Sequence, residues 1–222
     1  MSVRVIAIDG PAGAGKSTVA KRVAAVTGLP YLDTGAMYRC VAFAVIRDDI
    51  DVHDAERVGQ LAQASRIVVE KDSAVIDGDD VSDVIRGHEV TSVVSIIAAH
   101  SPVRTAMREQ QREWIRSHGG GVVEGRDIGT VVFPDALVKI FLTASPQERA
   151  RRRVLQSGGD VEEIARAIAE RDRLDSSRED SPLRPHEDSI IVDSSGLSID
   201  EVVDTIAQAF LVREKESEPG RG

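Results

Sequence analysis

The fold is decided by the stretch Gly10-Pro11-Ala12-Gly13-Ala14-Gly15-Lys16-Ser17, which fits the pattern G-x-x-x-x-G-K-[ST] in full. It follows the short apolar run Val3–Ile8, typical of a buried strand, and it opens a segment with helical spacing from about Lys16 to Val26. A strand, a glycine-rich turn and a helix in this order form a phosphate-binding loop, where backbone N–H groups and the helix N-terminus face a phosphate. The stretch therefore predicts an α/β fold that binds a nucleoside triphosphate.

Individual residues of this loop suggest individual roles. Lys16 can reach the β- and γ-phosphates, and the Ser17 hydroxyl can ligate Mg²⁺. The alternative is a glycine-rich turn with a chance lysine, which the flanking strand and helix disfavour. The loop alone does not separate a kinase from a GTP-dependent switch or a motor. The predicted ATP-binding residues are Gly10, Pro11, Ala12, Gly13, Ala14, Gly15, Lys16, Ser17 and Thr18.

The rest of the chain alternates between strand-like and helix-like segments. Val122-Val123, Leu137–Leu142 and Ile190–Val192 have the composition of core strands, and helical patterns lie between them. This alternation predicts a parallel sheet with helices on both faces. Residues 66–82 differ, because short β-type pieces flank Asp77-Gly78, and they predict a small hairpin insert.

The composition excludes several classes of protein. The 222 residues carry a net charge of -9, which argues against a general coat for nucleic acid or anionic membranes. No apolar run approaches a membrane span, and the N-terminus shows no secretory pattern. The single cysteine, Cys40, rules out an intramolecular disulfide framework and is expected to be a small buried residue. We therefore expect a cytoplasmic enzyme with no nucleic-acid or membrane partner, and a monomer, because no long amphipathic dimerisation helix is evident.

Missing features narrow the choice among phosphate-loop proteins. The chain contains no asparagine, so the Asn-Lys-x-Asp motif with which GTP-binding switches read guanine cannot be present. We also find no sign of three features that are typical of motors, namely a greater length, a sensor region, and an apolar run followed by an acid. A chain of this size with this loop is most consistent with transfer of a phosphoryl group to a small acceptor.

Three further motifs identify a family. They are Tyr31–Arg39 after the first helix, Gly125–Ala136 after the strand at Val122, and Arg171-Asp172-x-x-Asp175-x-x-Arg178. With these motifs the sequence resembles the bacterial cytidylate kinases, a family of nucleoside monophosphate kinases, over nearly the whole chain. The resemblance implies transfer of the γ-phosphoryl of ATP to CMP or dCMP with Mg²⁺, as a step of pyrimidine nucleotide metabolism. It also implies a five-stranded parallel sheet with an acceptor-binding insert and a mobile lid.

The resemblance divides one kinase domain into parts. These are a core (about 1–33, 88–147 and 185–213), an acceptor-binding insert (about 34–87) and a lid (about 148–184), and the polar residues 214–222 are expected to form a frayed tail. Lid arginines are expected to close on the transferring phosphoryl group. The predicted catalytic residues are Lys16, Arg126, Arg149 and Arg153.

The resemblance also assigns an acceptor site. Arg39 and Arg126 would hold the CMP phosphate, and Asp127 would accept from the cytosine amino group and repel the uracil oxygen. Ser95 and Arg104 would contact the rest of the base edge. Asp33 either contacts Mg²⁺ through a water molecule or caps the following helix. The predicted CMP-binding residues are Thr34, Tyr38, Arg39, Ser95, Arg104, Gly125, Arg126, Asp127, Arg171, Asp175 and Arg178.

Other interpretations of these residues and of the acceptor remain open. Arg104, Arg108, Arg112 and Arg116 form an i+4 stripe that on its own indicates a solvated helix face. The acceptor could instead be UMP, AMP or shikimate, or the chain could hydrolyse ATP as a regulatory module without a small acceptor.

The charge is unevenly distributed. Residues 48–100 and 185–222 together carry -14, and the other segments, which hold every predicted phosphate-handling residue, carry +5. We therefore expect an acidic exterior around a locally basic site. Arginine outnumbers lysine 23 to 5, which fits phosphate binding but can also follow from codon bias.

Overall fold

A computed structural model describes residues 3–70 and 72–217 as two compact units. Unit 1 comprises residues up to Tyr31 and from His118 onward, and unit 2 comprises Leu32–Ser117. Residues 88–117, predicted to belong to the core, fall in unit 2, because α4 (His88–Ile97) packs on α2 (Thr34–Arg47).

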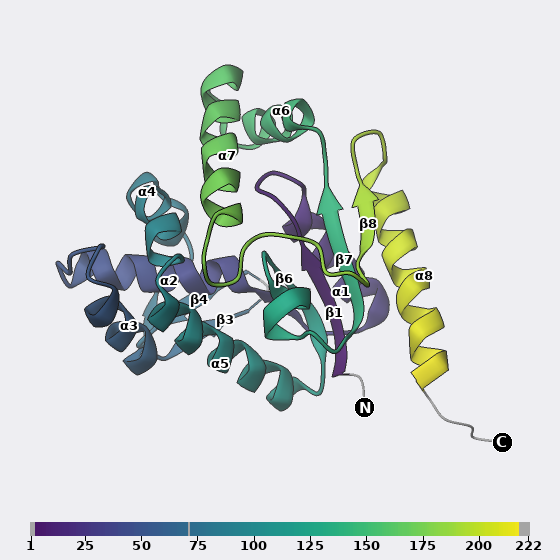
Figure 1. Ribbon diagram of the computed structural model, residues 1–222, viewed down its shortest axis with the longest axis horizontal. Coiled ribbons are helices and arrows are strands. Elements are labelled where there is room, and N and C mark those ends of the chain that lie inside the picture. Colours follow the sequence, from purple (N-terminus) through teal and green to yellow (C-terminus); the bar gives the residue numbers. More distant parts are fainter. Residues whose placement is uncertain (1–2, 71, 218–222) are drawn as a thin grey trace. The chain divides into compact units, whose positions relative to one another are not determined.

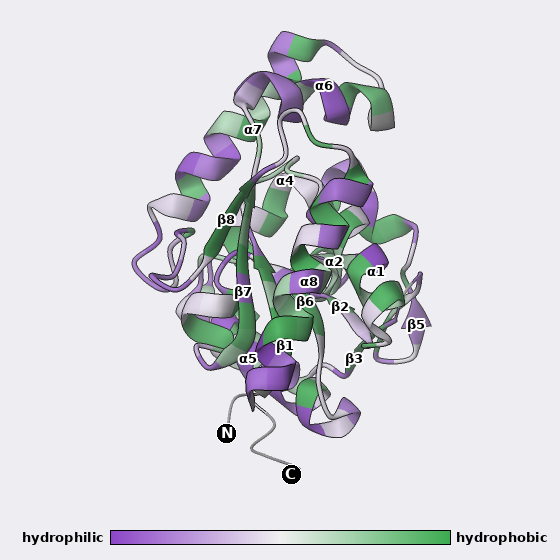
Figure 2. Cartoon of the chain, turned by 90° about the vertical axis from the view of Figure 1, so that its right-hand side faces the viewer, coloured by the Kyte–Doolittle hydropathy of each residue, from purple (hydrophilic) through white to green (hydrophobic). Residues whose placement is uncertain are grey.

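The central feature is a five-stranded sheet, as predicted, and its strands lie in the order β2-β6-β1-β7-β8. The strands β1 (Val3–Asp9), β6 (Gly121–Gly125), β7 (Ala136–Thr143) and β8 (Ile190–Asp193) pair in parallel, and β2 (Tyr31–Asp33) completes the sheet. Figure 2 shows β7 and β8 as hydrophobic ribbons, which agrees with strands buried in a sheet interior.

Two helices cover one face of this sheet. Helices α1 (Lys16–Thr27) and α8 (Ile199–Ser217) pack on each other and on the strands (Figure 1). The core between them includes Ile6, Ile8 and Ile140 from the strands and Phe210 from α8, all almost fully buried. On the other face, the π-helical turn η2 (Ile128–Val132) packs on β1, β6 and β7.

The chain after β7 forms two helices and a long return to β8. Helix α6 (Pro146–Ser157) is capped by Ser145, and α7 (Val161–Ser176) is capped by Asp160, whose carboxylate accepts from Glu162 and Glu163 N–H. Figure 1 shows α6 and α7 at the end of the sheet toward which β1 and β7 point. These helices make up most of the segment predicted as a lid.

Helix α8 corrects the predicted tail. The helix continues to Ser217, and i,i+3 contacts support its last turns, because Arg213 pairs with Glu216 and the Ser217 hydroxyl bonds to the Glu214 carbonyl. The prediction of a frayed tail is therefore wrong for residues 214–217, and its remainder, 218–222, lies outside the described residues.

Unit 2 is mainly helical. The helices α2, α3 (Ala55–Ala64), α4 and α5 (Ser101–His118) accompany the short η1 (Val84–Arg86). The predicted hairpin is a three-stranded antiparallel sheet of β3 (Ile67–Val69), β4 (Ala74–Ile76) and β5 (Asp79–Asp80). Among the described residues of both units, no helix is long and apolar enough to cross a membrane.

Candidate active site

The phosphate loop joins β1 to α1 in unit 1. Gly10 has a positive φ of 152°, and a Cβ there would lie 2.0 Å from the Leu142 carbonyl oxygen, so only glycine fits. Gly15 caps α1 in the left-handed conformation. The loop therefore depends on its glycines for both a close approach to β7 and the turn into the helix.

Lys16 lies over this loop and is 8% exposed. Its Nζ donates to the carbonyl oxygens of Gly10 and Pro11, each at 2.8 Å. Burial, and next the positive charge of Arg126, lower the pKa of Lys16 to about 7. The negative charge of a bound phosphate would act against both effects, because it favours the charged form of the lysine, so Lys16 is poised to take up a proton when a phosphate binds.

Ser17 faces a buried acid that the sequence interpretation missed. Its hydroxyl donates to Glu124 Oε2 at 3.1 Å, and the Tyr31 hydroxyl donates to the other carboxylate oxygen. Glu124 is 4% exposed and ends the apolar run Val122-Val123 on β6, so the acid-after-apolar-run feature judged absent is present. A serine hydroxyl beside a carboxylate is a donor set of hard oxygen atoms, which fits Mg²⁺.

A second buried carboxylate organises the turn after β6. The two oxygens of Asp9 accept from the N–H groups of Ile128 at 2.8 Å and Gly129 at 2.7 Å. Burial raises the pKa of Asp9 to about 7, although these hydrogen bonds favour its charged form. Because Asp127 directly precedes this turn and is 4% exposed, Asp9 fixes the backbone that carries the predicted base-reading carboxylate.

The predicted acceptor-site residues of unit 1 form an ion-pair cluster. Asp175, on α7, accepts from Arg126 Nε at 2.7 Å and from Arg178 Nη2. Burial raises the pKa of Asp175, but Arg126 and Arg178, followed by Arg171, outweigh it and hold the pKa below its usual value. The structure thus brings together four predicted residues that lie up to 52 positions apart.

The arginines of α6 differ in what they contact. Arg149 is 8% exposed and donates to the Ala12 carbonyl of the phosphate loop at 3.0 Å. Arg152, not singled out from the sequence, donates to the Ala14 carbonyl at 3.3 Å and to the Ser194 carbonyl at 2.8 Å. Arg153 is exposed, so its catalytic role stays a prediction.

In unit 2, Tyr38 and Arg104 lie together. The Arg104 guanidinium stands 5.6 Å from the centre of the Tyr38 ring, and its Nη1 donates to the Ala98 carbonyl at 3.1 Å. Arg104 is 1% exposed, whereas Arg112 and Arg116 of the same stripe are exposed. The interpretation of the stripe as a solvated face therefore fails at Arg104.

The other predicted residues of unit 2 are held by local contacts. Arg39 Nη1 donates to the Ile85 carbonyl and the Thr91 hydroxyl at 2.8 and 2.9 Å. Thr34 is buried in the first turn of α2, and Ser95 is half-buried on α4. These contacts do not test the predicted roles of the three residues in CMP binding, so those roles stay hypotheses.

Asp33 is a helix cap. Its Oδ1 accepts the Ala36 N–H at 3.0 Å, and its Oδ2 lies 3.5 Å from Arg86 Nη2. The capping alternative is thereby confirmed, and a link to Mg²⁺ through water stays a prediction. Cys40 is fully buried as expected, and burial raises the pKa of its thiol to about 12.

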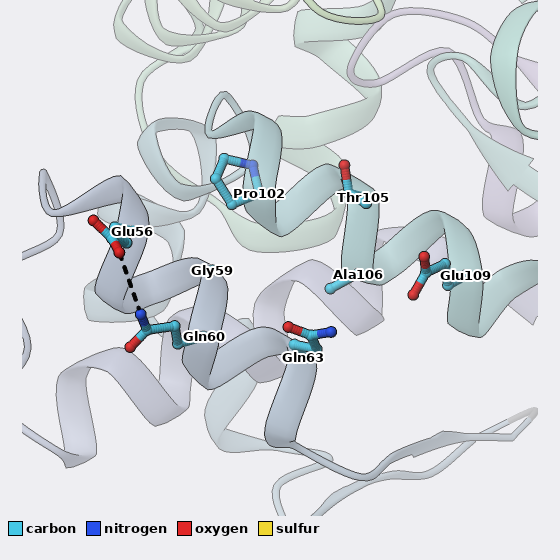
Figure 3. Close-up of a pocket in the computed structure, with 8 residues that line it drawn as sticks. All are labelled: Glu56, Gly59, Gln60, Gln63, Pro102, Thr105, Ala106 and Glu109. Carbon is cyan, nitrogen blue, oxygen red and sulfur yellow. Dashed lines mark hydrogen bonds between the residues drawn. The ribbon is translucent and has the colours of Figure 1, made fainter.

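A cavity of about 290 Å³ lies between α3 and α5 in unit 2 (Figure 3). Its one drawn hydrogen bond joins Gln60 Nε2 to Glu56 Oε1 at 3.5 Å. None of the predicted substrate residues lines it, so we do not assign it to the active site. The lining residues are Glu56, Gly59, Gln60, Gln63, Pro102, Thr105, Ala106 and Glu109.

The sheet order and the phosphate loop define the fold of the P-loop kinases. Solved structures share the fold: a gluconokinase from Sinorhizobium meliloti 1021 has a TM-score of 0.53 and 15% identity, covering 97% of each chain. TT1252 from Thermus thermophilus has a TM-score of 0.53 and 21% identity, covering 96% of this chain and 98% of that one.

Sequence comparison gives the family. The cytidylate kinase family model matches residues 6–211. The cytidylate kinase of Desulforamulus reducens is 50% identical over 211 residues, covering 91% of this chain and 95% of that protein. The cytidylate kinase of Mycolicibacterium paratuberculosis is 49% identical over 220 residues, covering 95% and 96%. The chain belongs to the cytidylate kinase family, and the resemblance is confirmed.

Some relatives are longer. The bifunctional pantoate ligase/cytidylate kinase of Prochlorococcus marinus (strain MIT 9303) is 49% identical over 221 residues, which cover 94% of this chain but 45% of that protein. The chain thus spans about half the length of these curated relatives.

Proposed function

We propose that the protein transfers the γ-phosphoryl group of ATP to CMP and dCMP, giving ADP and CDP or dCDP. The observation that carries this proposal is a buried acid, Asp127, two residues beyond the end of β6 in the same unit as the phosphate loop. The proposal places the reaction in pyrimidine nucleotide metabolism and in the cytoplasm, with the chain acting as a monomer on small molecules.

The reaction needs neutralisation of charge more than a general base. A phosphate monoester has a second pKa of about 6, so its oxygen is already a nucleophile at neutral pH. The two polyanionic substrates must be brought together in line for the transfer. This requires cationic side chains that contact them in a site from which bulk water is excluded. Lys16 is proposed to hold the ATP phosphates, and Arg126 and Arg39 the CMP phosphate, with Arg149 and Arg153 beside the transferring group.

Ser17 and Glu124 are the residues proposed to hold Mg²⁺, with the serine as ligand and the carboxylate orienting it. Mg²⁺, when bound, neutralises charge on the phosphate oxygens. The short contact of the Tyr31 hydroxyl with Glu124 keeps the carboxylate in place. Asp33 is proposed only as a group that acts through water.

Asp127 is proposed to select cytosine, because a carboxylate accepts from the amino group of cytosine and repels the oxygen of uracil. Ser95 and Arg104 are proposed to contact the remaining base edge. Thr34, Tyr38, Arg171, Asp175 and Arg178 are proposed to complete the site around sugar and phosphate.

The test is a coupled ADP-release assay with CMP, dCMP, UMP, AMP, GMP and shikimate, with and without Mg²⁺. We expect Mg²⁺-dependent release that is fastest with CMP or dCMP. ADP release that no monophosphate accelerates would favour a regulatory ATPase and would overturn the proposal.

A variant tests base selection separately. Asp127→Ala removes a charged contact to the base amino group, which is worth about 1–3 kcal/mol, so the CMP-over-UMP ratio of kcat/KM should fall about 5- to 150-fold. Asp135→Ala, at an exposed acid in the following segment, is the matched control. An unchanged ratio in Asp127→Ala would refute this account of selection.

A further inference from the structure

Asp172, on α7, links the phosphate loop to Arg149. Its Oδ1 accepts the Ala12 N–H at 3.0 Å, and its other carboxylate oxygen pairs with Arg149 Nη1. The same Nη1 donates to the Ala12 carbonyl at 3.0 Å. Both polar groups of Ala12 are therefore bound, and Ala12, Arg149 and Asp172 close a ring of hydrogen bonds across three elements of unit 1.

Other contacts of Arg149 fix its direction. Its Nε donates to the Ala144 carbonyl at 3.2 Å, and its backbone packs so closely on Gly13 that a Cβ there would lie 3.1 Å from Arg149 Cβ. Ordering an otherwise free arginine side chain costs conformational entropy, and here that cost is already met before any ligand binds. Among the described residues, none accepts from Nη2 of Arg149, so this nitrogen remains available to a phosphate oxygen.

The charge and the burial of Asp172 allow it to hold the Ala12 N–H and the Arg149 guanidinium at the same time. Its side chain is 18% exposed and that of Arg149 is 10% exposed, so the pair is shielded from most solvent. A carboxylate accepts on both oxygens at once, and here one oxygen takes the backbone N–H while the other takes the guanidinium. Glu170, two residues earlier, is exposed, and its partner among the described residues is Arg173 of its own helix.

We propose that Asp172 is a positioning residue for phosphoryl transfer: it holds the Arg149 guanidinium against the Ala12 peptide of the phosphate loop. The proposal rests on the proposed function for the catalytic role of Arg149. Asp172 acts through Arg149 and Ala12 and need not touch a substrate. Loss of its charge should therefore slow the transfer step without weakening the binding of CMP.

The experiment compares Asp172→Asn with Glu170→Gln in steady-state assays with ATP and CMP. The asparagine keeps an acceptor for the Ala12 N–H but loses the charge that holds Arg149. We expect kcat to fall about 10- to 100-fold, with KM for CMP within threefold, because a misplaced catalytic group costs rates of this order. Asp172→Glu, which retains the carboxylate, should recover part of kcat, and Glu170→Gln should match the wild type.

A double-mutant cycle separates positioning from general support of the fold. If Asp172 acts through Arg149, then Asp172→Asn should reduce kcat no further in an Arg149→Met background. Additive losses would overturn the proposal, as would an unchanged kcat, an effect on KM for CMP alone, or a circular-dichroism melt that shows Asp172→Asn unfolded at the assay temperature.

The proposed function can fail separately. A wild-type protein that does not phosphorylate CMP refutes that function, and the cycle is then run on ADP formation with water as the acceptor, which would use the same arginine. With an active wild type, an unchanged kcat in Asp172→Asn refutes only the positioning role.

Discussion

Asp175→Asn should destabilise the protein strongly, although the two side chains have nearly the same shape. The carboxylate is 1% exposed and each of its oxygens faces an arginine, Arg126 or Arg178. With an amide in its place, two guanidinium groups that are themselves largely out of solvent would lose their negatively charged partner. The substitution thus probes charge rather than packing.

The structure sets the expected magnitude. The side chains of Arg178 and Arg126 are only 6% and 16% exposed. Water therefore cannot take the place of the lost carboxylate beside either cation. Removing one member of a buried ion pair costs about 3–5 kcal/mol, and we take about 3 kcal/mol because asparagine still accepts one hydrogen bond. For a chain of this length that lowers the unfolding midpoint by about 6–12 °C.

Thermal unfolding followed by circular dichroism measures this shift. Glu170→Gln is the matched control on the same helix, since its pair with Arg173 is exposed and solvent screens it, and its midpoint should not change measurably. A midpoint for Asp175→Asn within about 2 °C of the wild type would refute the reasoning, because it would mean that the cluster adds no net stability.

Two further predictions concern the phosphate loop. The pKa of Lys16 is lowered to about 7, so above that pH a phosphate must bind with uptake of a proton, and the affinity for ADP should fall by up to about tenfold per pH unit. Calorimetry at pH 8 in buffers of different ionisation enthalpy should detect this proton uptake. Proton uptake that persists in Lys16→Met would contradict the assignment to Lys16. Glu124→Gln weakens the group that orients Ser17, so the Mg²⁺ concentration for half-maximal activity should rise about tenfold; a Mg²⁺ titration indistinguishable from that of Glu170→Gln would exclude this role.

Local signals predicted most of the fold. The apolar runs Val3–Ile8, Leu137–Leu142 and Ile190–Val192 lie in strands of the parallel sheet, and the phosphate loop opens helix α1, as predicted. Prediction failed at the end of α8, where polar composition indicated fraying. There, contacts such as that of Glu214 with Arg4, distant by 210 positions, accompany a helix that composition alone does not reveal.

The sequence predicted the candidate-site groups to which a motif assigns a role, but not three acids that hold them in place, although one of these acids, Asp172, stands inside a quoted motif. Asp9, Glu124 and Asp172 bond to partners 107 to 160 positions away. No spacing rule connects such pairs, because the fold alone brings them together. A weak signal existed for Glu124, as an acid that ends an apolar strand beside the phosphate loop.

These acids change the interpretation of the charge. The segments with a net charge of +5 predict a basic site, yet Asp175 lies between Arg126 and Arg178, and Asp172 pairs with Arg149. A lysine in such a pair would give its single charged group to the carboxylate. A guanidinium has five donors in a fixed plane, so it can bind a carboxylate along one edge and a phosphate along another. This geometry gives the excess of arginine over lysine a structural reason beyond codon bias, because each arginine can be held in place and still bind.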